Sequence, residues 1–292
     1  MNKKFNKGIL LTSLGSFWWG FIGVIYFEYV SFIGHVELVV HRCLWTAVML
    51  IITTTFFSKW KIFFTIIKKN NFLVALFISG FLIFINWAVW IYAVATDRII
   101  DASFGYFIMP IISVLLGKIF FKENLNRKRI FSIILVFISI LILLFFNLRS
   151  LPWVGLIVAF SWAFYNLVRK KINIDTDIGL LIESLYILPF ALITFYFITQ
   201  KGFNDFSLAK PNLSLLLILA GPMTVIPLFL YVRGVELIGL GPTGMVFYIT
   251  PTLQFILGFF YYNEDFSLIK FLSFIIIWIA VIIYLKDLYE TN

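Results

Sequence analysis

The chain has 292 residues, of which 62% are hydrophobic and only 13% are charged, and its mean hydropathy is +1.03. A soluble domain of this length could not cover so much apolar surface with so few charged side chains, which excludes a water-soluble protein. The net charge of +9 does not indicate a nucleic-acid partner, because the Lys and Arg residues form short clusters between apolar runs, as topology signals and contacts with anionic lipid do.

Ten apolar runs, each of about the length that a helix needs to cross the hydrocarbon core, follow one another along the chain. The first is longer than the core of a signal peptide and lacks a clear cleavage site, so we expect it to be retained as a helix. The connections are too short to hold a soluble domain. The predicted fold class is therefore an all-α polytopic membrane protein with ten transmembrane helices. The runs lie at 8–27, 37–57, 72–95, 101–121, 129–146, 152–168, 179–199, 213–232, 241–261 and 268–285.

The Lys and Arg residues predict how these spans are oriented. When the N-terminus is placed in the cytoplasm, sixteen of the 23 lie on the cytoplasmic side and five on the other side. Because cytoplasmic loops are the ones enriched in Lys and Arg, both termini are expected in the cytoplasm. The bias is weakest after the eighth span, where it depends on Arg233 alone.

A stretch that begins at Asp101 has a counterpart 141 positions later in the chain. Within the two stretches Pro110 aligns with Pro251, and Glu123 aligns with Glu264. Spans one to five therefore correspond to spans six to ten, and because five is odd the two halves cross the membrane in opposite directions. Inverted repeats are typical of secondary transporters, whose binding site lies near the midplane between the repeats. The predicted repeats are residues 1–147 and 148–292.

Pro110 and Pro251 each fall near the middle of a predicted span. A proline there removes one backbone donor and clashes with the carbonyl four residues earlier, which kinks the helix. The freed carbonyls must be satisfied by neighbouring helices or by a water-filled cavity. Two interpretations follow: the prolines are hinges in helices that line a pathway, or they are kinks that only shape the bundle.

Three polar residues lie near the start of the second span. Glu37 and His41 are four residues apart, which places them on one helix face, where a carboxylate and an imidazole can pair. Arg42 follows directly. One interpretation gives these side chains a role in proton or charge coupling at a cavity. The other makes them an anchor at the membrane interface, with Arg42 reaching the lipid headgroups.

Glu183 lies about one turn into the seventh span and has no basic residue three or four positions away on its own helix. An unpaired carboxylate within the membrane is a functional candidate, either for a proton or for a cationic group of a substrate. The alternative is a structural link to Arg169 or Lys170 at the cytoplasmic surface.

Aromatic and amide side chains within the spans are the candidates for substrate binding. Most tryptophans in a membrane protein belong to interfacial belts or to packing, so only those near the middle of a span are included. Asn86 and Trp90 share a helix face, and Gln254 follows Pro251 by three positions. The full set is Asn86, Trp87, Trp90, Tyr106, Trp162, Tyr165, Tyr248 and Gln254.

No motif in the chain indicates a cofactor, a metal ion or an active site. Residues Gly239 to Gly244 fit the G-x-G-x-x-G pattern, but a full apolar span precedes them, another follows, and Pro242 occupies the turn. A nucleotide site requires a β-strand before the glycines. The sequence also lacks a Walker A motif, a His/Cys cluster and a nucleophile triad, so we expect no cofactor, no metal and no ATP-driven transport.

Several segments of the chain resemble a known family. They are Glu37, His41, Arg42 and Trp45, then Asn86-Trp87, ASFGYFIMP at 102–110, SWAFYNLVRK at 161–170, GLLIESLYILP at 179–189, and the segment 227–258. Together they are similar to the EamA-type branch of the drug/metabolite transporter superfamily, and within it to the RarD (chloramphenicol-sensitivity) members. The resemblance covers nearly the whole chain and implies ten helices in two EamA repeats in a bacterial inner membrane. Asn166 and Phe104 depart from the family's usual Gly and Leu, which puts the cavity lining in doubt.

These observations predict a secondary transporter, a permease or exporter, that moves a small organic metabolite, an amino acid or a drug-like compound across the inner membrane by alternating access. For ion-coupled transport, Glu183 or the pair Glu37 and His41 is the expected place for a proton. The expected partners are a small-molecule substrate and membrane lipid, with no nucleic acid, and the protein is expected as a monomer or a homodimer.

Two other functions remain open at this stage. A membrane scaffold or receptor subunit would not need polar residues and paired prolines within its spans. An intramembrane enzyme would need a nucleophile and a base, or a metal site, facing a cavity, and only Glu37 and His41 approach that arrangement.

Overall fold

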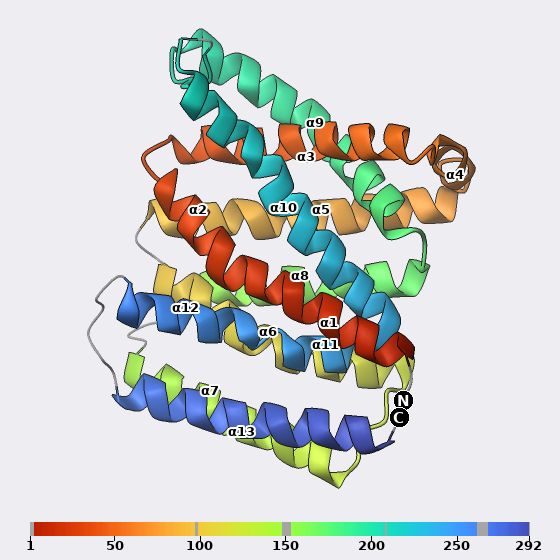
Figure 1. Cartoon of the computed structure of the whole chain (residues 1–292), viewed down its shortest axis with the longest axis vertical. Coiled ribbons are helices and arrows are strands. Elements are labelled where there is room, and N and C mark those ends of the chain that lie inside the picture. Colours follow the sequence, from red (N-terminus) through yellow and green to blue (C-terminus); the bar gives the residue numbers. More distant parts are fainter. Residues whose placement is uncertain (1–2, 97–98, 148–152, 208, 262–267, 292) are drawn as a thin grey trace.

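The computed structural model describes residues 3–96, 99–147, 153–207, 209–261 and 268–291, and every element in these ranges is a helix (Figure 1). Glu264 and the side chain of Phe104 lie outside the described residues. In chain order the helices are α1 (Lys3–Phe17), the π-helical turn η1 (Trp18–Ile22), α2 (Gly23–Tyr29), α3 (His35–Phe56), α4 (Trp60–Ile66), α5 (Asn70–Ala95), α6 (Ile99–Phe121), α7 (Arg127–Asn147), α8 (Trp153–Ile172), α9 (Thr176–Gln200), α10 (Pro211–Ile238), α11 (Leu240–Val246), α12 (Ile249–Phe260) and α13 (Leu268–Thr291).

Each predicted apolar run coincides with one helix or with helical segments that follow each other directly. The first run is divided into α1, η1 and α2, and the ninth is divided into α11 and α12. Among the described residues, seven helical stretches are long and apolar enough to cross a membrane, and the described part of α6 adds a shorter apolar helix. The chain is therefore an all-helical, multi-pass membrane protein.

The helices lie side by side, and both chain ends are at the same end of the bundle (Figure 1). We call this the terminus end, where α1 begins and α13 ends, and we call the opposite end the far end. Helix α1 packs against α10, as α8 packs against α5, and α10 packs against α3, as α5 packs against α9. When spans one to three are matched to spans six to eight, α1, α3 and α5 correspond to α8, α9 and α10. The contact of α1 with α10 then corresponds to that of α8 with α5, and the contact of α10 with α3 to that of α5 with α9. The packing therefore follows the repeat in the sequence.

The two repeat prolines occupy different positions in their helices. Pro110 lies inside α6, as predicted. Pro251 lies near the middle of the predicted ninth span, and the interruption there is a full break: the chain leaves the helix at Phe247 and Tyr248, between α11 and α12, and Pro251 falls in the first turn of α12. A first-turn residue has no intrahelical acceptor for its N–H, so a proline is tolerated there. The proline predicted a kink within one long apolar run, but not that the run would divide into two helices.

The break in the ninth run faces the π-helical turn in the first. A β-carbon on Gly20, within η1, would lie 2.8 Å from the backbone oxygen of Thr250, so only glycine permits this approach. The Thr250 hydroxyl in turn donates a hydrogen bond to the Ser16 carbonyl oxygen at 3.0 Å. A π-helical turn frequently marks a functional position in a helix, and here it lies against the break in the ninth run.

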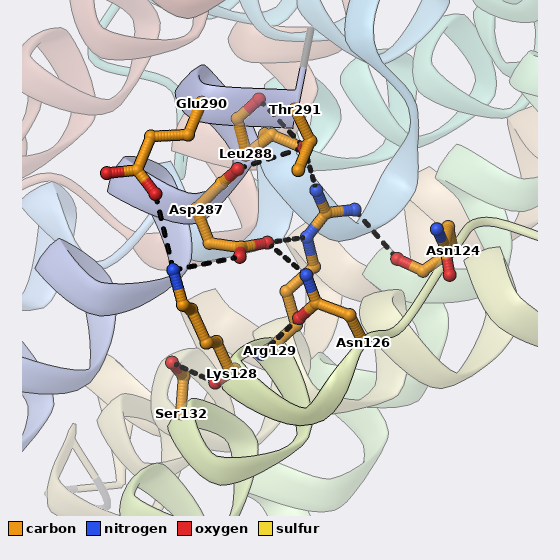
Figure 2. A network of polar contacts seen from close by, with 9 residues as sticks. All are labelled: Asn124, Asn126, Lys128, Arg129, Ser132, Asp287, Leu288, Glu290 and Thr291. Carbon is orange, nitrogen blue, oxygen red and sulfur yellow. Dashed lines mark hydrogen bonds and ion pairs between the residues drawn. The ribbon is translucent and has the colours of Figure 1, made fainter.

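A polar network at the terminus end joins α7 to α13 (Figure 2). Arg129 Nε donates to Asp287 Oδ2 at 2.8 Å, and the amide of Asn126 donates to the same oxygen at 2.7 Å. The remaining guanidinium nitrogens of Arg129 bind the Asn124 carbonyl oxygen and the Thr291 hydroxyl. The last helices of the two halves are therefore held together at this end by buried charge-assisted hydrogen bonds.

Candidate substrate cavity

A cavity with about 610 Å³ of space free of protein atoms, its mouth included, lies among helices from both halves of the chain. The first half contributes η1, α2, α3, α5 and α6, and the second half contributes α8, Phe247 in the break after α11, and α12. The lining residues are Trp19, Gly23, Val24, Phe27, Arg42, Asn86, Trp87, Trp90, Tyr106, Trp162, Phe247, Thr250 and Gln254.

The cavity occupies the half of the bundle at the far end. Helices α1, η1 and α2 run from the terminus end to the far end, and their lining residues begin only at Trp19. Arg42 lies near the start of α3, which begins at the far end, and Trp90 lies near the end of α5, which finishes there. The lining residue of α6, Tyr106, is also nearer to the start of its helix, at the far end.

Seven of the residues predicted for substrate binding or coupling line this cavity. They are Arg42, Asn86, Trp87, Trp90, Tyr106, Trp162 and Gln254. Sequence reasoning missed Trp19, Phe27, Phe247 and Thr250, which are also in the lining. The run LGSFWWG at 14–20 carried a usable signal for Trp19, but the adjacent Trp18 could not be told from it without the geometry of the π-helical turn.

Aromatic rings close the inner side of the cavity. Trp19 meets Trp162 edge to face, with 5.2 Å between ring centroids, and both also contact Tyr231. Phe247 packs against Tyr231 and against Tyr106. Such edge-on contacts are favourable beyond the area that they bury. Tyr231 lies in the last third of α10, which ends at the terminus end, so the cluster extends from the cavity toward that end (Figure 1).

Arg42 is the one lining residue with a formal charge in the described part of the chain, and only 6% of it is exposed. Its Nε donates a hydrogen bond to Thr224 Oγ1 at 2.9 Å. The guanidinium carbon lies 5.1 Å from the ring centroid of Phe27 and 4.6 Å from that of Trp87, both lining residues. Arg42 therefore belongs to the cavity, and the interpretation of it as an anchor reaching the lipid headgroups is wrong.

The amide of Asn86 is held by the second half of the chain. Its nitrogen donates to the Val158 carbonyl oxygen at 2.9 Å and to the Ser161 hydroxyl at 3.1 Å, both on α8. Asn86 thus lines the cavity and joins α5 to α8. These two bonds fix the orientation of the Asn86 amide at the cavity wall.

Tyr248 is buried and does not line the cavity, although it was predicted to bind substrate. Its hydroxyl donates a hydrogen bond to the Phe107 carbonyl oxygen at 2.8 Å, which joins the break after α11 to the part of α6 that precedes Pro110. Backbone carbonyls near a proline need such partners in a membrane. Tyr248 therefore connects two corresponding helices of the repeat.

Glu183 is paired, so the prediction of an unpaired carboxylate is wrong and the alternative link to Arg169 is correct. Arg169 Nη1 lies 3.3 Å from Glu183 Oε1, the Ser79 hydroxyl donates to the same oxygen at 2.5 Å, and the Tyr165 hydroxyl donates to Oε2 at 3.2 Å. The partners come from α5 and α8, whereas a search for spacing examines only α9 itself. Tyr165, another predicted substrate residue, is therefore part of this network and not of the cavity lining.

Glu183 also lines a second, smaller cavity of about 250 Å³ between α3, α5, α9 and α10. Trp87 lines both cavities, so its ring lies between them. The carboxyl group thus lines a cavity that shares the wall residue Trp87 with the main cavity.

Glu37 and His41 form the predicted pair, with 3.5 Å between Glu37 Oε1 and His41 Nε2, but neither lines either of the two cavities described above. Glu37 Oε1 accepts hydrogen bonds from the backbone N–H groups of Asp205 and Phe206 in the connection before α10. His41 Nδ1 accepts one from the indole of Trp45 at 3.2 Å. Through these hydrogen bonds, Glu37 and His41 join α3 to this connection at the far end.

Further contacts at the terminus end join the two halves. Both oxygens of Glu123, which follows α6, accept backbone N–H groups at the start of α11, from Leu240 at 2.8 Å and Gly241 at 2.9 Å. Burial raises the pKa of the Glu123 carboxyl, while these two donors act in the opposite direction. Glu236, at the end of α10, is bound by Arg233 and Thr176. The described residues place no group of three His, Cys, Asp or Glu side chains that could hold a metal ion.

The comparisons with known proteins agree with this architecture. The model of the EamA-like transporter family matches the chain twice, at residues 6–145 and 150–286. The chain is 34% identical over 290 residues to Protein RarD of Escherichia coli (strain K12), covering 99% of this chain and 97% of RarD. It is 34% identical over 281 residues to the uncharacterized transporter YojE of Bacillus subtilis (strain 168), covering 95% and 93%.

A solved crystal structure with only 12% sequence identity has the same fold. It superposes with a TM-score of 0.71 over 95% of this chain and 96% of that chain. With two family matches that together span nearly every residue, and with relatives that are named as transporters, the chain belongs to the EamA-like transporter family.

Proposed function

We propose that this protein is a secondary transporter of the bacterial inner membrane that moves a small organic molecule through the cavity by alternating access. The proposal includes ten membrane spans in two inverted five-helix repeats, residues 1–147 and 148–292, with both termini in the cytoplasm. The observation that carries it is the cavity itself, which is aromatic, is lined from both halves of the chain and has a cluster of aromatic rings on the side toward the terminus end. Transporters with inverted repeats bind their substrates at such a position.

The position of the cavity supports a conformation that faces away from the cytoplasm. Both chain ends lie at one end of the bundle (Figure 1), which agrees with an even number of spans. Between the cavity and that end lie the aromatic cluster, the network of Glu183 and the contact of Glu123 with α11. Opening toward the cytoplasm would require these contacts to separate while the far end closes. Pro110, Pro251 and the turn η1 are the backbone interruptions at which the helices would bend.

Within this mechanism, a coupled proton is assigned to Glu183 in preference to Glu37 and His41. Glu183 lies beside the path from the cavity to the terminus end, and its partners come from two other helices, α5 and α8, which would move relative to α9 on opening. Glu37, which pairs with His41, instead accepts hydrogen bonds from the connection before α10, at the far end of the bundle. A carboxyl group that loses a cationic partner in one conformation takes up a proton there more readily.

Ligand binding to the purified protein tests the proposed function. Amino acids, small metabolites and chloramphenicol would be screened for compounds that raise the thermal unfolding temperature in detergent, and those compounds would then be tested for flux into proteoliposomes. Gln254→Ala and Tyr106→Phe remove polar groups from the cavity, and Gln200→Ala, on the exposed end of α9, is the matched control.

We expect at least one compound to stabilise the native chain and Gln200→Ala, to stabilise the two cavity variants less, and to enter the proteoliposomes. Stabilisation that is equal in all four proteins would place the site elsewhere. Binding without flux, or the absence of any stabilising compound, would favour a scaffold or receptor subunit.

A further inference from the structure

Arg42 is a buried cation without an anionic partner among the described residues. Its side chain is 6% exposed, and the contacts that the structure gives it are the Thr224 hydroxyl and the rings of Phe27 and Trp87. The nearest acidic residue in the sequence, Glu37, is bound to the backbone of the connection before α10. A buried charge is costly unless it is paired, so this arrangement indicates a partner that is not part of the described chain.

The guanidinium group of Arg42 is fixed in orientation, but most of its N–H groups have no hydrogen-bond acceptor among the described residues. A guanidinium carries five N–H donors, and within the described part of the chain only the one on Nε is bound, by Thr224. The two aromatic rings and Thr224 hold the plane of the group. The two terminal nitrogens present the planar fork that matches the two oxygens of a carboxylate.

The rest of the lining complements a ligand with a single negative charge and an apolar body. None of the described lining residues is acidic, and Arg42 is the one basic residue among them. The Tyr106 hydroxyl and the Gln254 amide have no hydrogen-bond partner among the described residues, so they are available to a ligand. Trp19, Trp90 and other aromatic rings form most of the remaining wall.

We propose that the cavity binds an organic monocarboxylate with an aromatic or branched apolar body, whose carboxylate is held by the guanidinium group of Arg42. This inference rests on the proposed function, because it takes the cavity as the substrate site. One cation balances one carboxylate, whereas a phosphate dianion would retain a buried charge. A ligand ammonium would lie close to Arg42 with no acidic group in the described lining to balance it.

Matched sets of ligands test the charge requirement. Each set contains a carboxylate, its methyl ester and the corresponding amine, all with the same apolar group, and is added to the purified full-length chain. The first set is 3-phenylpropanoate, methyl 3-phenylpropanoate and 3-phenylpropylamine, together with the zwitterion phenylalanine. Thermal unfolding and Kd would be measured for the native chain, Arg42→Met, Arg42→Lys and the control Gln200→Ala.

We expect the carboxylate of at least one set to bind more tightly than its ester, amine and zwitterion. Arg42→Met should weaken its binding by about 30-fold or more, the effect of losing charge-assisted hydrogen bonds. Arg42→Lys should weaken it less, because the charge remains but the planar fork is lost. Without ligand, Arg42→Met should unfold at the same temperature as the native chain or higher, since it removes an unpaired buried charge.

Several outcomes would overturn the inference: no carboxylate that binds, carboxylate binding that survives Arg42→Met, or tighter binding of the amine or the zwitterion. A ligand-free Arg42→Met that unfolds well below the native chain would make Arg42 a structural residue with a partner in the protein. If an ester or amine binds and Gln254→Ala weakens that binding, the proposed carboxylate site is wrong while the proposed transport function stands. If a carboxylate binds through Arg42 but never crosses the membrane, the anion site stands and the transport function fails.

Discussion

Glu183 and Arg169 show how charge is accommodated inside the bundle. Both side chains are buried, and together they use hydrogen-bond partners on α5, α8 and α9. Breaking a buried ion pair leaves one charge without compensation, whereas replacing both charges with apolar side chains of similar volume is often neutral. The pair is therefore expected to be sensitive to the loss of one member and tolerant to the loss of both.

We predict that Glu183→Gln lowers the free energy of unfolding by about 3 kcal/mol, because Arg169 then loses its closest carboxylate and remains buried. The double variant Arg169→Met with Glu183→Met should recover most of this loss. Thermal and denaturant unfolding in detergent would measure both. Glu290→Gln is the control, since Glu290 pairs with the exposed Lys128 and should change stability by less than about 1 kcal/mol. A single variant as stable as the double variant would contradict the prediction.

Among the helices, α11 depends most clearly on a residue outside itself. It has only seven residues, and its first N–H groups are bound by Glu123, which lies after α6 in the other half of the chain. Gly239, which precedes it, has a φ of 93°, a conformation that favours glycine. A short helix of this kind is marginal alone, so an external carboxylate at its positive end is an important part of its stability.

We predict that Glu123→Gln loosens the start of α11. An amide has one acceptor oxygen, so one of the two N–H groups, from Leu240 or Gly241, would face the NH₂ group, at a cost of about 1–3 kcal/mol. Hydrogen exchange would show this as faster exchange at the amides of α11. Glu28→Gln, at an exposed position of α2, is the control and should leave the exchange unchanged. Unchanged protection of α11 in Glu123→Gln would show that Glu123 does not hold the helix.

For the whole molecule, hydropathy predicted the helices well because membrane thickness imposes their length and composition. It could not predict the break before Ile249 or the π-helical turn that begins at Trp18, since both change the backbone without changing the apolar character. Polar and aromatic residues within the spans led to much of the cavity, Arg42 and Gln254 included, because such residues are costly in lipid without a purpose. Arg169, the partner of Glu183, could be named only as an alternative, because it lies on another helix and the spacing along α9 does not show it.

The arrangement of the whole chain also makes a prediction about sidedness. Three single cysteines would be introduced after Cys43, which is buried, is replaced by Ala: Val24→Cys in the cavity, Lys201→Cys at the far end and Lys128→Cys at the terminus end. A thiol reagent that does not cross membranes would be added to spheroplasts and to inside-out vesicles. With cytoplasmic termini, Lys128→Cys should react only in the vesicles and Lys201→Cys only in spheroplasts.

Val24→Cys is the informative position. Because the aromatic cluster and the network of Glu183 lie between the cavity and the terminus end, it should react in spheroplasts, from the same side as Lys201→Cys. A transported ligand should slow that reaction by occupying the cavity, and it should expose the same cysteine in inside-out vesicles as the population shifts to the opposite conformation. Reaction of Val24→Cys from the Lys128→Cys side alone, with or without ligand, would contradict a cavity that opens at the far end.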